Sequence, residues 1–204
     1  MFFLTTLKNK IMIKRFKVIS LYDYLFSFAL IMFLWPLLLL IYIVILLDIG
    51  SPLFIQKRVG KNKKIFNLLK FRTLKIGTPS LASHKINSSY VSNTGKILRK
   101  LKLDELPQLI NVLKGEMSLV GPRPNLPIQK ELIRERDKYN LYRFKPGITG
   151  LSQINNIDMS NPELLAESDY KMMINFNQIA YLKYLFRTFI GKGNGDAVIY
   201  KKEM

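Results

Sequence analysis

An uncharged, apolar stretch near the N-terminus constrains the fold of this chain more than any other feature. Between Asp23 and Asp48 no residue carries a charge, and most are Leu, Ile, Phe or Val. The stretch exceeds the ~18 apolar residues that indicate a membrane helix. It is too long for a cleaved signal peptide, and no small-residue cleavage site follows it. The sequence therefore predicts a membrane helix joined to one soluble domain, which is about as much as 204 residues allow.

Both flanks of this stretch are basic, and Pro36 lies near its middle. Basic flanks favour the cytoplasmic side of a membrane, and a proline inside a helix removes a hydrogen bond and kinks or breaks the helix. A helix that enters the leaflet, bends at Pro36 and returns keeps both flanks on one side, and the sequence favours this re-entrant form. A single kinked span is the alternative, because membrane helices tolerate proline. The basic residues are Lys8, Lys10, Lys14, Arg15 and Lys17 before the stretch, and Lys57, Arg58, Lys61, Lys63 and Lys64 after it.

The charge balance limits the partners and the chemistry of the chain. Its net charge of +18 implies an anionic partner, which is a nucleic acid, an anionic leaflet or a phosphorylated substrate. The absence of cysteine excludes disulfides, thiolate catalysis and cysteine-based zinc sites. The single histidine, His84, lies in a Ser/Thr/Asn/Gly-rich stretch that reads as a solvated loop. Any catalysis must therefore rely on carboxylates and a hard cation.

The soluble part is predicted to be mostly helical, an α+β fold with one basic β-hairpin. Apolar and basic residues at 52–58 and 65–72 are joined by a Gly-Lys-Asn turn, which is typical of a hairpin. Helices are also expected at 128–142 and from Glu163 onward. The last part of the chain's helical region, residues 179–190, alternates apolar residues with two cations. That pattern suits an amphipathic helix lying on lipid, although a core helix fits nearly as well.

Two further helices are predicted between the hairpin and the charged helix. Asn93-Thr94 offers a cap for the first. Asp104 is expected to be the N-cap of the second, with Pro107 in its first turn and Gly115 at its end. The apolar residues expected to face inward are Ile97, Leu98 and Leu101 on the first helix, and Leu109, Ile110, Val112 and Leu113 on the second.

The adjacent carboxylates Asp104 and Glu105 are the strongest candidates for chemistry. When the pair is taken alone, helix capping and the helix dipole explain both carboxylates without any chemistry. Their neighbours favour a phosphate site, because Arg99 lies five residues upstream and a helix N-terminus offers free amides. One carboxylate can attack phosphorus while its neighbour holds a divalent cation.

Several cations are candidates for binding that phosphate. Arg123 stands between Pro122 and Pro124, and this rigid setting holds its planar fork in place at little entropic cost. The alternative is a turn whose arginine pairs with a local carboxylate. The cations of the hairpin have two possible roles. They either bind a diphosphate or contact anionic lipid, and the lipid contact contributes ~1 kcal/mol per cation. The hairpin residues considered for these roles are Gln56, Lys57, Arg58, Lys70 and Arg72.

The run LRKLKLDELPQLINVLKGEMSLVGPRP, residues 98–124, resembles the signature of the bacterial sugar transferases, which are monotopic phosphoglycosyl transferases. The resemblance extends to residues 50–60, 70–73 and 145–154, and it covers roughly residues 20–189. It implies a basic flank at 1–19, a re-entrant membrane helix at 20–49, a cytosolic transferase domain at 50–190 and a flexible tail at 191–204. It also implies that the protein lies on the cytoplasmic face of the bacterial inner membrane.

The resemblance implies a reaction in two steps. Asp104 would attack the sugar-bearing phosphate of a UDP-sugar, releasing UMP and leaving a covalent phosphosugar. We expect the sugar of this donor to be N-acetylated. Undecaprenyl phosphate, the polyprenyl acceptor, would then take the phosphosugar and begin a surface glycan. Glu105 would hold Mg²⁺, Arg99 would bind phosphate, and the Pro122-Arg123-Pro124 element would face the nucleotide. The remaining basic positions that match the family are Arg58, Lys70 and Arg72.

The chain departs from the family pattern at three places, and none of them touches the acid pair. Trp35 precedes Pro36 where relatives often have serine, and Asn156-Ile157-Asp158 replaces a common Gly-Arg pair. Tyr181 stands where many members carry aspartate. The expected partners are the UDP-sugar, undecaprenyl phosphate and membrane lipid, with no nucleic acid. A homo-oligomer or other enzymes of the glycan pathway are left open as partners.

Two other functions compete with the transferase. A membrane-tethered basic module that binds an anionic ligand would explain the charge and the apolar helix, but not the Asp-Glu-Leu-Pro-Gln run. A catalytically inactive scaffold for glycan enzymes is the second alternative, and the intact acid pair weighs against it.

Overall fold

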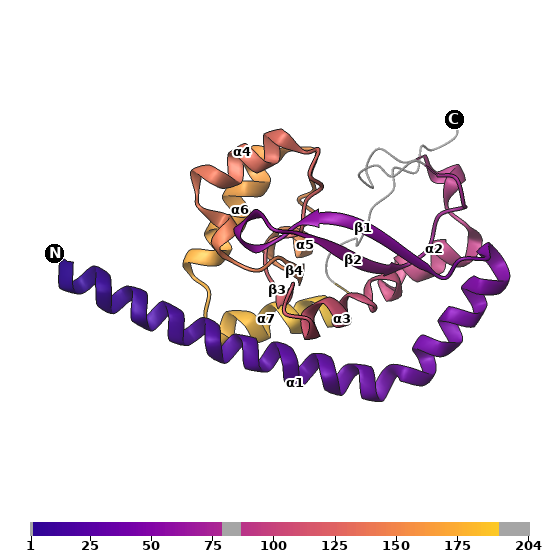
Figure 1. The fold of residues 1–204 in the computed structure, drawn as a ribbon, viewed down its shortest axis with the longest axis horizontal. Helices are drawn as coiled ribbons and strands as arrows, with labels where there is room; N and C mark the ends of the chain where they lie inside the picture. Colours follow the sequence, from indigo (N-terminus) through magenta and orange to yellow (C-terminus); the bar gives the residue numbers. More distant parts are fainter. Residues whose placement is uncertain (1, 79–86, 192–204) are drawn as a thin grey trace.

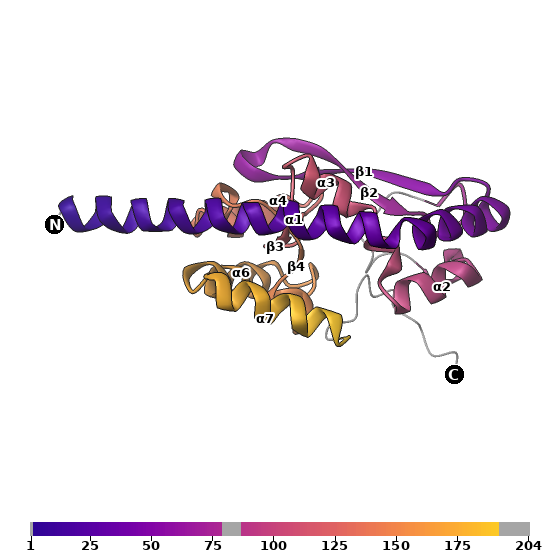
Figure 2. The same ribbon diagram turned by 90° about the horizontal axis from the view of Figure 1, so that it is seen from below.

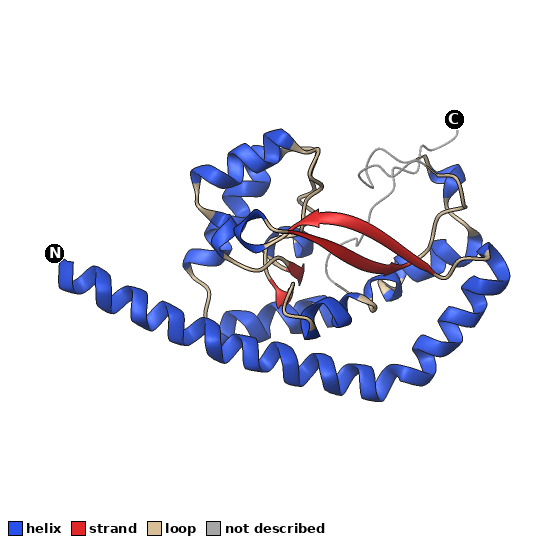
Figure 3. Cartoon of the chain, in the orientation of Figure 1, coloured by secondary structure: helices blue, strands red, loops and turns tan. Residues whose placement is uncertain are grey.

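The computed structural model describes residues 2–78 and 87–191 of the chain, with the side chains of residues 2–15, 17 and 88 left out. The expectations for His84 and for a flexible tail beyond Gly191 lie outside these residues. The helices are α1 (Phe2–Ile49), α2 (Asn93–Lys100), α3 (Gln108–Leu113), α4 (Lys130–Lys138), α5 (Leu151–Ile154), α6 (Pro162–Ile174) and α7 (Gln178–Phe189). The strands are β1 (Leu53–Val59), β2 (Ile65–Phe71), β3 (Ser118–Val120) and β4 (Gly147–Thr149). The prediction of a mostly helical α+β fold is confirmed (Figure 3).

The helix α1 is long and apolar, and it curves around one side of the domain. Residues Val18–Ile49 are long and apolar enough to enter a membrane, with a mean hydropathy of 3.0 in their most apolar window. Figure 1 shows α1 bending in its second half, which is also the half that contains Pro36. Most of its large apolar side chains are exposed, Phe33 at 83% and Leu47 at 82%. A protein in water would not leave such a surface uncovered.

Both parts of α1 nevertheless pack against the same domain. Toward its N-terminus, Ile19 belongs to the main core, which also contains Leu119 of β3 and Tyr181 of α7. Toward its C-terminus, Ile45 joins a smaller cluster with Phe71 of β2 and Leu98 of α2. The two contacts lie on either side of the bend, so α1 is held at both ends of its apolar stretch.

Tyr181, which stands where many members of the family carry aspartate, makes a buried hydrogen bond with Asp23. Its hydroxyl donates to Oδ1 of Asp23 at 2.9 Å, and the backbone amide of Leu119 donates to the same oxygen at 2.9 Å. Tyr181 is fully buried and Asp23 almost so. A tyrosine at this position gives the Asp23 carboxyl a donor, so it joins α1, β3 and α7 at one point.

The antiparallel strands β1 and β2 sort their side chains onto two faces. Arg58 pairs across the strands with Phe66, and Gln56 with Leu68, in a regular register. Because side chains alternate along a strand, Gln56, Arg58 and Lys70 all face the domain and are buried. The exposed residues of the hairpin include Lys57, and its turn contains Asn62 at a φ of 53°.

The helix α2 presents a different face to the domain from the one predicted. Its N-cap is Ser92, whose side chain accepts a hydrogen bond from the amide of Gly95. Leu98 is buried as expected, but Ile97 and Leu101 are 61% and 58% exposed, which corrects the prediction. The cause is Gly95, because a Cβ there would lie 2.2 Å from the carbonyl oxygen of Thr73. The face of α2 that carries Gly95 can therefore approach the backbone after β2 more closely than a face with larger side chains could.

The expected N-cap at Asp104 is also wrong. Asp104 lies inside a short 3₁₀ turn, Leu103–Glu105, and α3 begins later with Pro107 at its N-cap position. Gly115, at a φ of 76°, follows the end of α3 as predicted.

The inward face of α3 is only partly the apolar stripe that was predicted. Leu109 and Val112 are buried, whereas Ile110 is 43% exposed and Leu113 is half-buried. The helix turns Asn111 inward instead, and the hydrogen bonds of that side chain fix the rotation.

Asn111 joins α3 to β2, and we expect its removal to be costly. Its Oδ1 accepts from the amide of Leu69 at 3.0 Å, and its Nδ2 donates to the carbonyl of Asn67 at 2.8 Å and to Glu116 at 2.7 Å. The substitution Asn111→Leu leaves buried backbone groups without partners, and each costs about 1–3 kcal/mol. Chemical denaturation should show a free energy of unfolding lower by about 2–4 kcal/mol. Asn175→Leu, at an exposed helix end, is the control.

The second half of the domain adds a short parallel pair, β3 and β4, which the sequence did not indicate. The helices α4 and α6 pack against each other, and α7 runs beside α1 (Figures 1 and 2). The predicted helix at 128–142 is shorter, at Lys130–Lys138, and the helix expected from Glu163 is Pro162–Ile174. On α7, Ile179 and Phe189 are 80% and 90% exposed, so its apolar face continues the apolar surface of α1.

Candidate active site

The acid pair lies in a tight turn between α2 and α3. The helix α2 ends at Lys100, and Lys102 then takes a left-handed conformation with a φ of 57°. A non-glycine residue pays about 1–3 kcal/mol for such a conformation, which is typical of functional sites. The turn that follows buries both carboxylates, with Asp104 3% and Glu105 8% exposed. The left-handed conformation of Lys102 therefore redirects the backbone so that the side chains of Asp104 and Glu105 are both buried.

Glu105 is surrounded by cations from three separate segments. Its Oε1 accepts from Nζ of Lys70 at 3.0 Å and from Nη2 of Arg123 at 3.2 Å. Lys102 is also close enough for electrostatic interaction with Glu105, although burial, with Arg123 nearby, lowers the pKa of Lys102. Since Lys70 and Glu105 are both buried, the attraction between their charges is screened less than that of a surface pair.

The Pro122-Arg123-Pro124 element is fixed through its backbone. The carbonyl of Pro122 accepts from the amide of Gly147 at 2.9 Å, and the carbonyl of Pro124 accepts from Nη1 of Arg58 at 2.8 Å. The carbonyl of Arg123 itself accepts from Nη1 of Arg136 at 2.8 Å. Every residue of the element is thus tied, which leaves the Arg123 side chain directed at Glu105.

Arg136 belongs to a buried network that sequence reasoning missed. Its Nη2 donates to Oδ2 of Asp169 at 2.6 Å, and its Nη1 also donates to Oδ1 of Asn125 at 3.1 Å. The hydroxyl of Ser152 donates to Oδ1 of Asp169 at 2.8 Å, and that of Tyr142 donates to Asn125 at 2.9 Å. The network joins α4, α5 and α6 to the segment that carries Arg123.

The predicted binding residues divide into two groups. Arg58, Lys70, Arg123 and Pro124 line one small crevice with Glu105. Arg99 is buried and donates through Nε to Oγ1 of Thr73 at 2.8 Å. Arg72 does not line the crevice, because its guanidinium donates to the carbonyls of Ser51 and Leu53 at the start of the hairpin.

One polar residue of the site, Gln108, was not predicted, whereas Gln56 was among the hairpin residues expected to bind phosphate. Gln108 is 3% exposed and lines the same crevice, one turn after Glu105. The spacing of three residues between them is the signal that could have identified it. Gln56 accepts from Nη2 of Arg58 at 2.6 Å, and the two-residue spacing along β1 places both on the buried face.

The donor types at the acid pair suit magnesium. Mg²⁺ is held by one or two carboxylates together with substrate phosphates and waters, and Asp104 and Glu105 supply two adjacent carboxylates. Within residues 2–78 and 87–191 no group of three or more His, Cys, Asp and Glu side chains gathers that could hold a metal unaided.

A buried Asp104-Glu105 pair, in which Glu105 binds Lys70 and Arg123, and a long exposed apolar helix are together typical of a membrane-associated enzyme. The family model described as bacterial sugar transferase matches residues 13–192, and the chain belongs to that family.

Three relatives illustrate the family. An uncharacterized sugar transferase, EpsL of Bacillus subtilis, is 42% identical over 71% of this chain and 72% of its own length. An undecaprenyl-phosphate glucose phosphotransferase of Komagataeibacter xylinus is 41% identical over 72% of this chain and 29% of its own length. A UDP-N-acetylgalactosamine-undecaprenyl-phosphate N-acetylgalactosaminephosphotransferase of Aeromonas hydrophila is 34% identical over 75% of this chain and 38% of its own length. The chain thus spans well under half the length of the latter two.

Proposed function

We propose that this chain transfers a sugar phosphate from a UDP-sugar to undecaprenyl phosphate. The single observation that carries the proposal is the buried Asp104-Glu105 pair, in which Lys70 and Arg123 hold Glu105. Family membership and the printed activities of two relatives support the general reaction. The donor, the intermediate and the released nucleotide are the finer parts of the proposal.

In the proposed first step, a carboxylate oxygen of Asp104 attacks the phosphorus that bears the sugar. A phosphorus–oxygen bond forms to Asp104, and the bond to the bridging oxygen of the diphosphate breaks, so UMP leaves with that oxygen. In the second step, a phosphate oxygen of undecaprenyl phosphate attacks the same phosphorus and displaces the Asp104 carboxylate. The product is a diphosphate-linked sugar, and the enzyme is regenerated.

The surrounding cations would stabilise the charge that gathers on the phosphate oxygens. Lys70 and Arg123 already lie beside Glu105, so they need little reorganisation to contact a diphosphate. Mg²⁺ held by Glu105 would neutralise phosphate oxygens when it is bound. Arg58 would act indirectly, by holding the carbonyl of Pro124 in place. Arg99 remains the proposed phosphate ligand. Arg72 is the least supported of the proposed phosphate-binding residues, because its guanidinium binds the carbonyls of Ser51 and Leu53.

We propose further that α1 is re-entrant and rests in the cytoplasmic leaflet of the bacterial inner membrane. The support is that Ile19 and Ile45, near opposite ends of the apolar stretch, both pack against the one domain. Ile19 and Ile45 are 26 positions apart in the sequence, so a straight helix rising about 1.5 Å per residue would separate them by about 39 Å across a membrane. Packing at both ends therefore favours a bent helix over a span.

Cysteine labelling tests this topology, since the chain has no cysteine of its own. We expect Lys10→Cys and Lys64→Cys to react equally with a membrane-impermeant maleimide in inside-out vesicles, and neither to react in right-side-out vesicles. Opposite labelling of the two positions would establish a spanning helix instead. The parent chain, which has no cysteine, should not react with the maleimide and is the control.

The experiment that tests the proposed function is UMP release by purified protein in detergent, with undecaprenyl phosphate and a panel of UDP-sugars. We expect release with at least one donor, an N-acetylated sugar being the first choice. We also expect release to fall to background when EDTA removes the divalent cation and to return with added Mg²⁺. If folded protein released no UMP with any donor of a broad panel, the result would instead favour a binding module or an inactive scaffold.

A further inference from the structure

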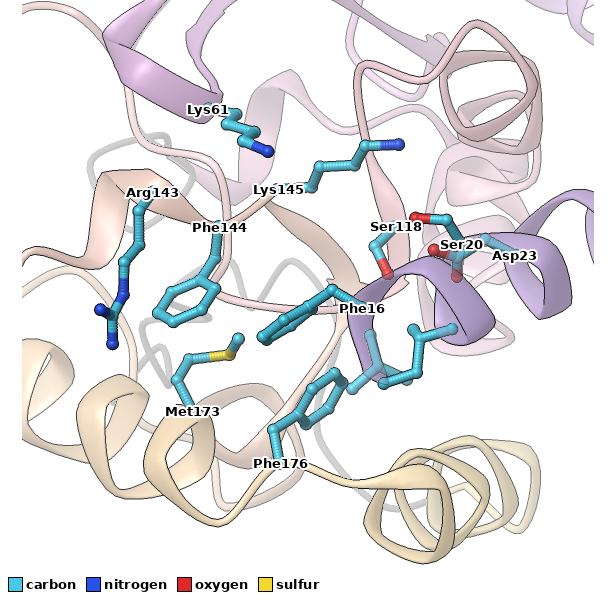
Figure 4. Close-up of a pocket in the computed structure, with 12 residues that line it drawn as sticks. Phe16, Ser20, Asp23, Lys61, Ser118, Arg143, Phe144, Lys145, Met173 and Phe176 are labelled. Atoms are coloured by element: carbon cyan, nitrogen blue, oxygen red, sulfur yellow. The ribbon is translucent and has the colours of Figure 1, made fainter. Parts of the chain in front are cut away.

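A second cavity, separate from the acid pair, lies where α1 meets the domain (Figure 4). It measures about 500 Å³ and shares no lining residue with the crevice beside Glu105. Its walls come from the N-terminal half of α1, the hairpin turn, β3, the segment between α4 and β4, and the end of α6 with the link to α7. A volume of this size is that of a small-molecule site rather than a packing defect.

The polar side of the cavity is cationic. Lys61, Arg143 and Lys145 line it, against the single carboxylate of Asp23. That carboxylate is already used, since its Oδ1 accepts from Leu119 and Tyr181. Burial lowers the pKa of Lys145 and Lys61 lowers it further, while Asp23 opposes the shift. An anion between the two lysines would relieve their repulsion.

The other side of the cavity is apolar and aromatic. The rings of Phe16 and Phe144 lie 5.1 Å apart, and those of Phe16 and Phe176 lie 5.9 Å apart. Met173 completes this surface, as Figure 4 shows. Arg143 lies over the ring of Phe144 at 4.6 Å, which places a cation at the edge of the aromatic surface. The cavity thus offers cations and an apolar wall to one ligand.

The position of the cavity matches the depth of a lipid headgroup. Its α1 residues, 16–23, come directly before the uncharged stretch 24–47. Phe176 leads into α7, whose exposed Ile179 and Phe189 extend the apolar surface of α1. Cations at the boundary between an apolar helix and a polar domain are typical of contacts with anionic headgroups.

We propose that this cavity binds an anionic phospholipid, with its phosphate between Lys61 and Lys145, Arg143 at the edge of the aromatic wall and one acyl chain along Phe16 and Phe176. The cavity would hold α1 and the domain together at the membrane surface. The proposal rests on insertion of α1 in a membrane and is independent of the proposed chemistry at Asp104.

The test is native mass spectrometry of the full chain, delipidated in detergent and then offered single lipids. We expect one phosphatidylglycerol to remain bound, at least about tenfold more tightly than phosphatidylcholine. Arg143→Gln/Lys145→Gln should lose this preference, whereas Lys130→Gln/Arg134→Gln on α4 removes the same charge and should keep it. Lys61→Gln, at an exposed position, should weaken binding in a protein whose fold is undisturbed.

Three results would overturn the proposal. Equal retention of phosphatidylglycerol and phosphatidylcholine would show that charge plays no part. An equal loss of binding in the α4 control would show that only net charge matters. Displacement of the lipid by glycerol 3-phosphate at concentrations as low as those of the lipid would show a soluble-phosphate site, with no role for the acyl chain. UMP release measured on the same variants separates these outcomes from failure of the proposed reaction, since a loss of lipid binding with UMP release intact concerns this cavity alone.

Discussion

Asp104→Asn should abolish UMP release while leaving the protein folded. The substitution keeps the shape of a residue that is 3% exposed, but an amide is a far poorer nucleophile toward phosphorus than a carboxylate. We expect a loss on the order of a thousandfold or more, because removing the attacking group removes the covalent path itself. The initial rate of UMP formation at saturating donor and acceptor is the measurement.

The matched control is Asp137→Asn, which makes the same change at an exposed ion pair with Lys63. Its rate should stay within about twofold of the parent, because exposed ion pairs contribute little. A thermal melt of both variants confirms that the fold is retained. If Asp104→Asn released UMP at the parent rate, Asp104 would not be the nucleophile and the two-step scheme would be wrong.

The second large effect is expected at the buried pair of Arg136 and Asp169. Asp169→Ala leaves the guanidinium of Arg136, which is 2% exposed, without its carboxylate partner. An uncompensated buried charge costs about 3–5 kcal/mol, so chemical denaturation should show a loss of that size. Activity should fall as well, because Arg136 would move from the carbonyl of Arg123 and release the element that faces Glu105.

A double substitution separates the two effects. Arg136→Met/Asp169→Leu removes both charges, and replacing a buried pair by apolar residues of similar size is often neutral for stability. We therefore expect most of the stability to return while UMP release stays low, since Arg123 still lacks the donor to its carbonyl. Recovery of full activity in the double variant would show that Arg136 does not position Arg123.

Local patterns predicted the helices and the hairpin because period and turn residues determine such elements over short distances. The alternation of β1 and β2 also explains why Arg58 and Lys70 turn toward the acid pair while Lys57 stays outside. The N-cap predicted at Asp104 was wrong for a local reason that the residue types do not reveal. Lys102 takes a left-handed conformation that glycine or asparagine would normally signal, so the cap expected at Asp104 became a 3₁₀ turn.

What the sequence did not indicate depends on long-range contacts. Arg136 and Asp169 are 33 residues apart, and no periodic pattern links them. The strands β3 and β4 have three residues each, and their close approach requires glycine, since a Cβ at Gly147 would lie 2.0 Å from the amide nitrogen of Gly121. The cavity between α1 and the domain likewise exists only once distant segments have packed.

The most direct test of the central claim is intact mass spectrometry of the protein incubated with its UDP-sugar and Mg²⁺, without undecaprenyl phosphate. We predict a mass gain of one sugar phosphate, located on Asp104 by peptide mapping, absent in Asp104→Asn and discharged when undecaprenyl phosphate is added. Efficient turnover with both substrates but no adduct under rapid acid quench would contradict the account, since it would require direct transfer between donor and acceptor.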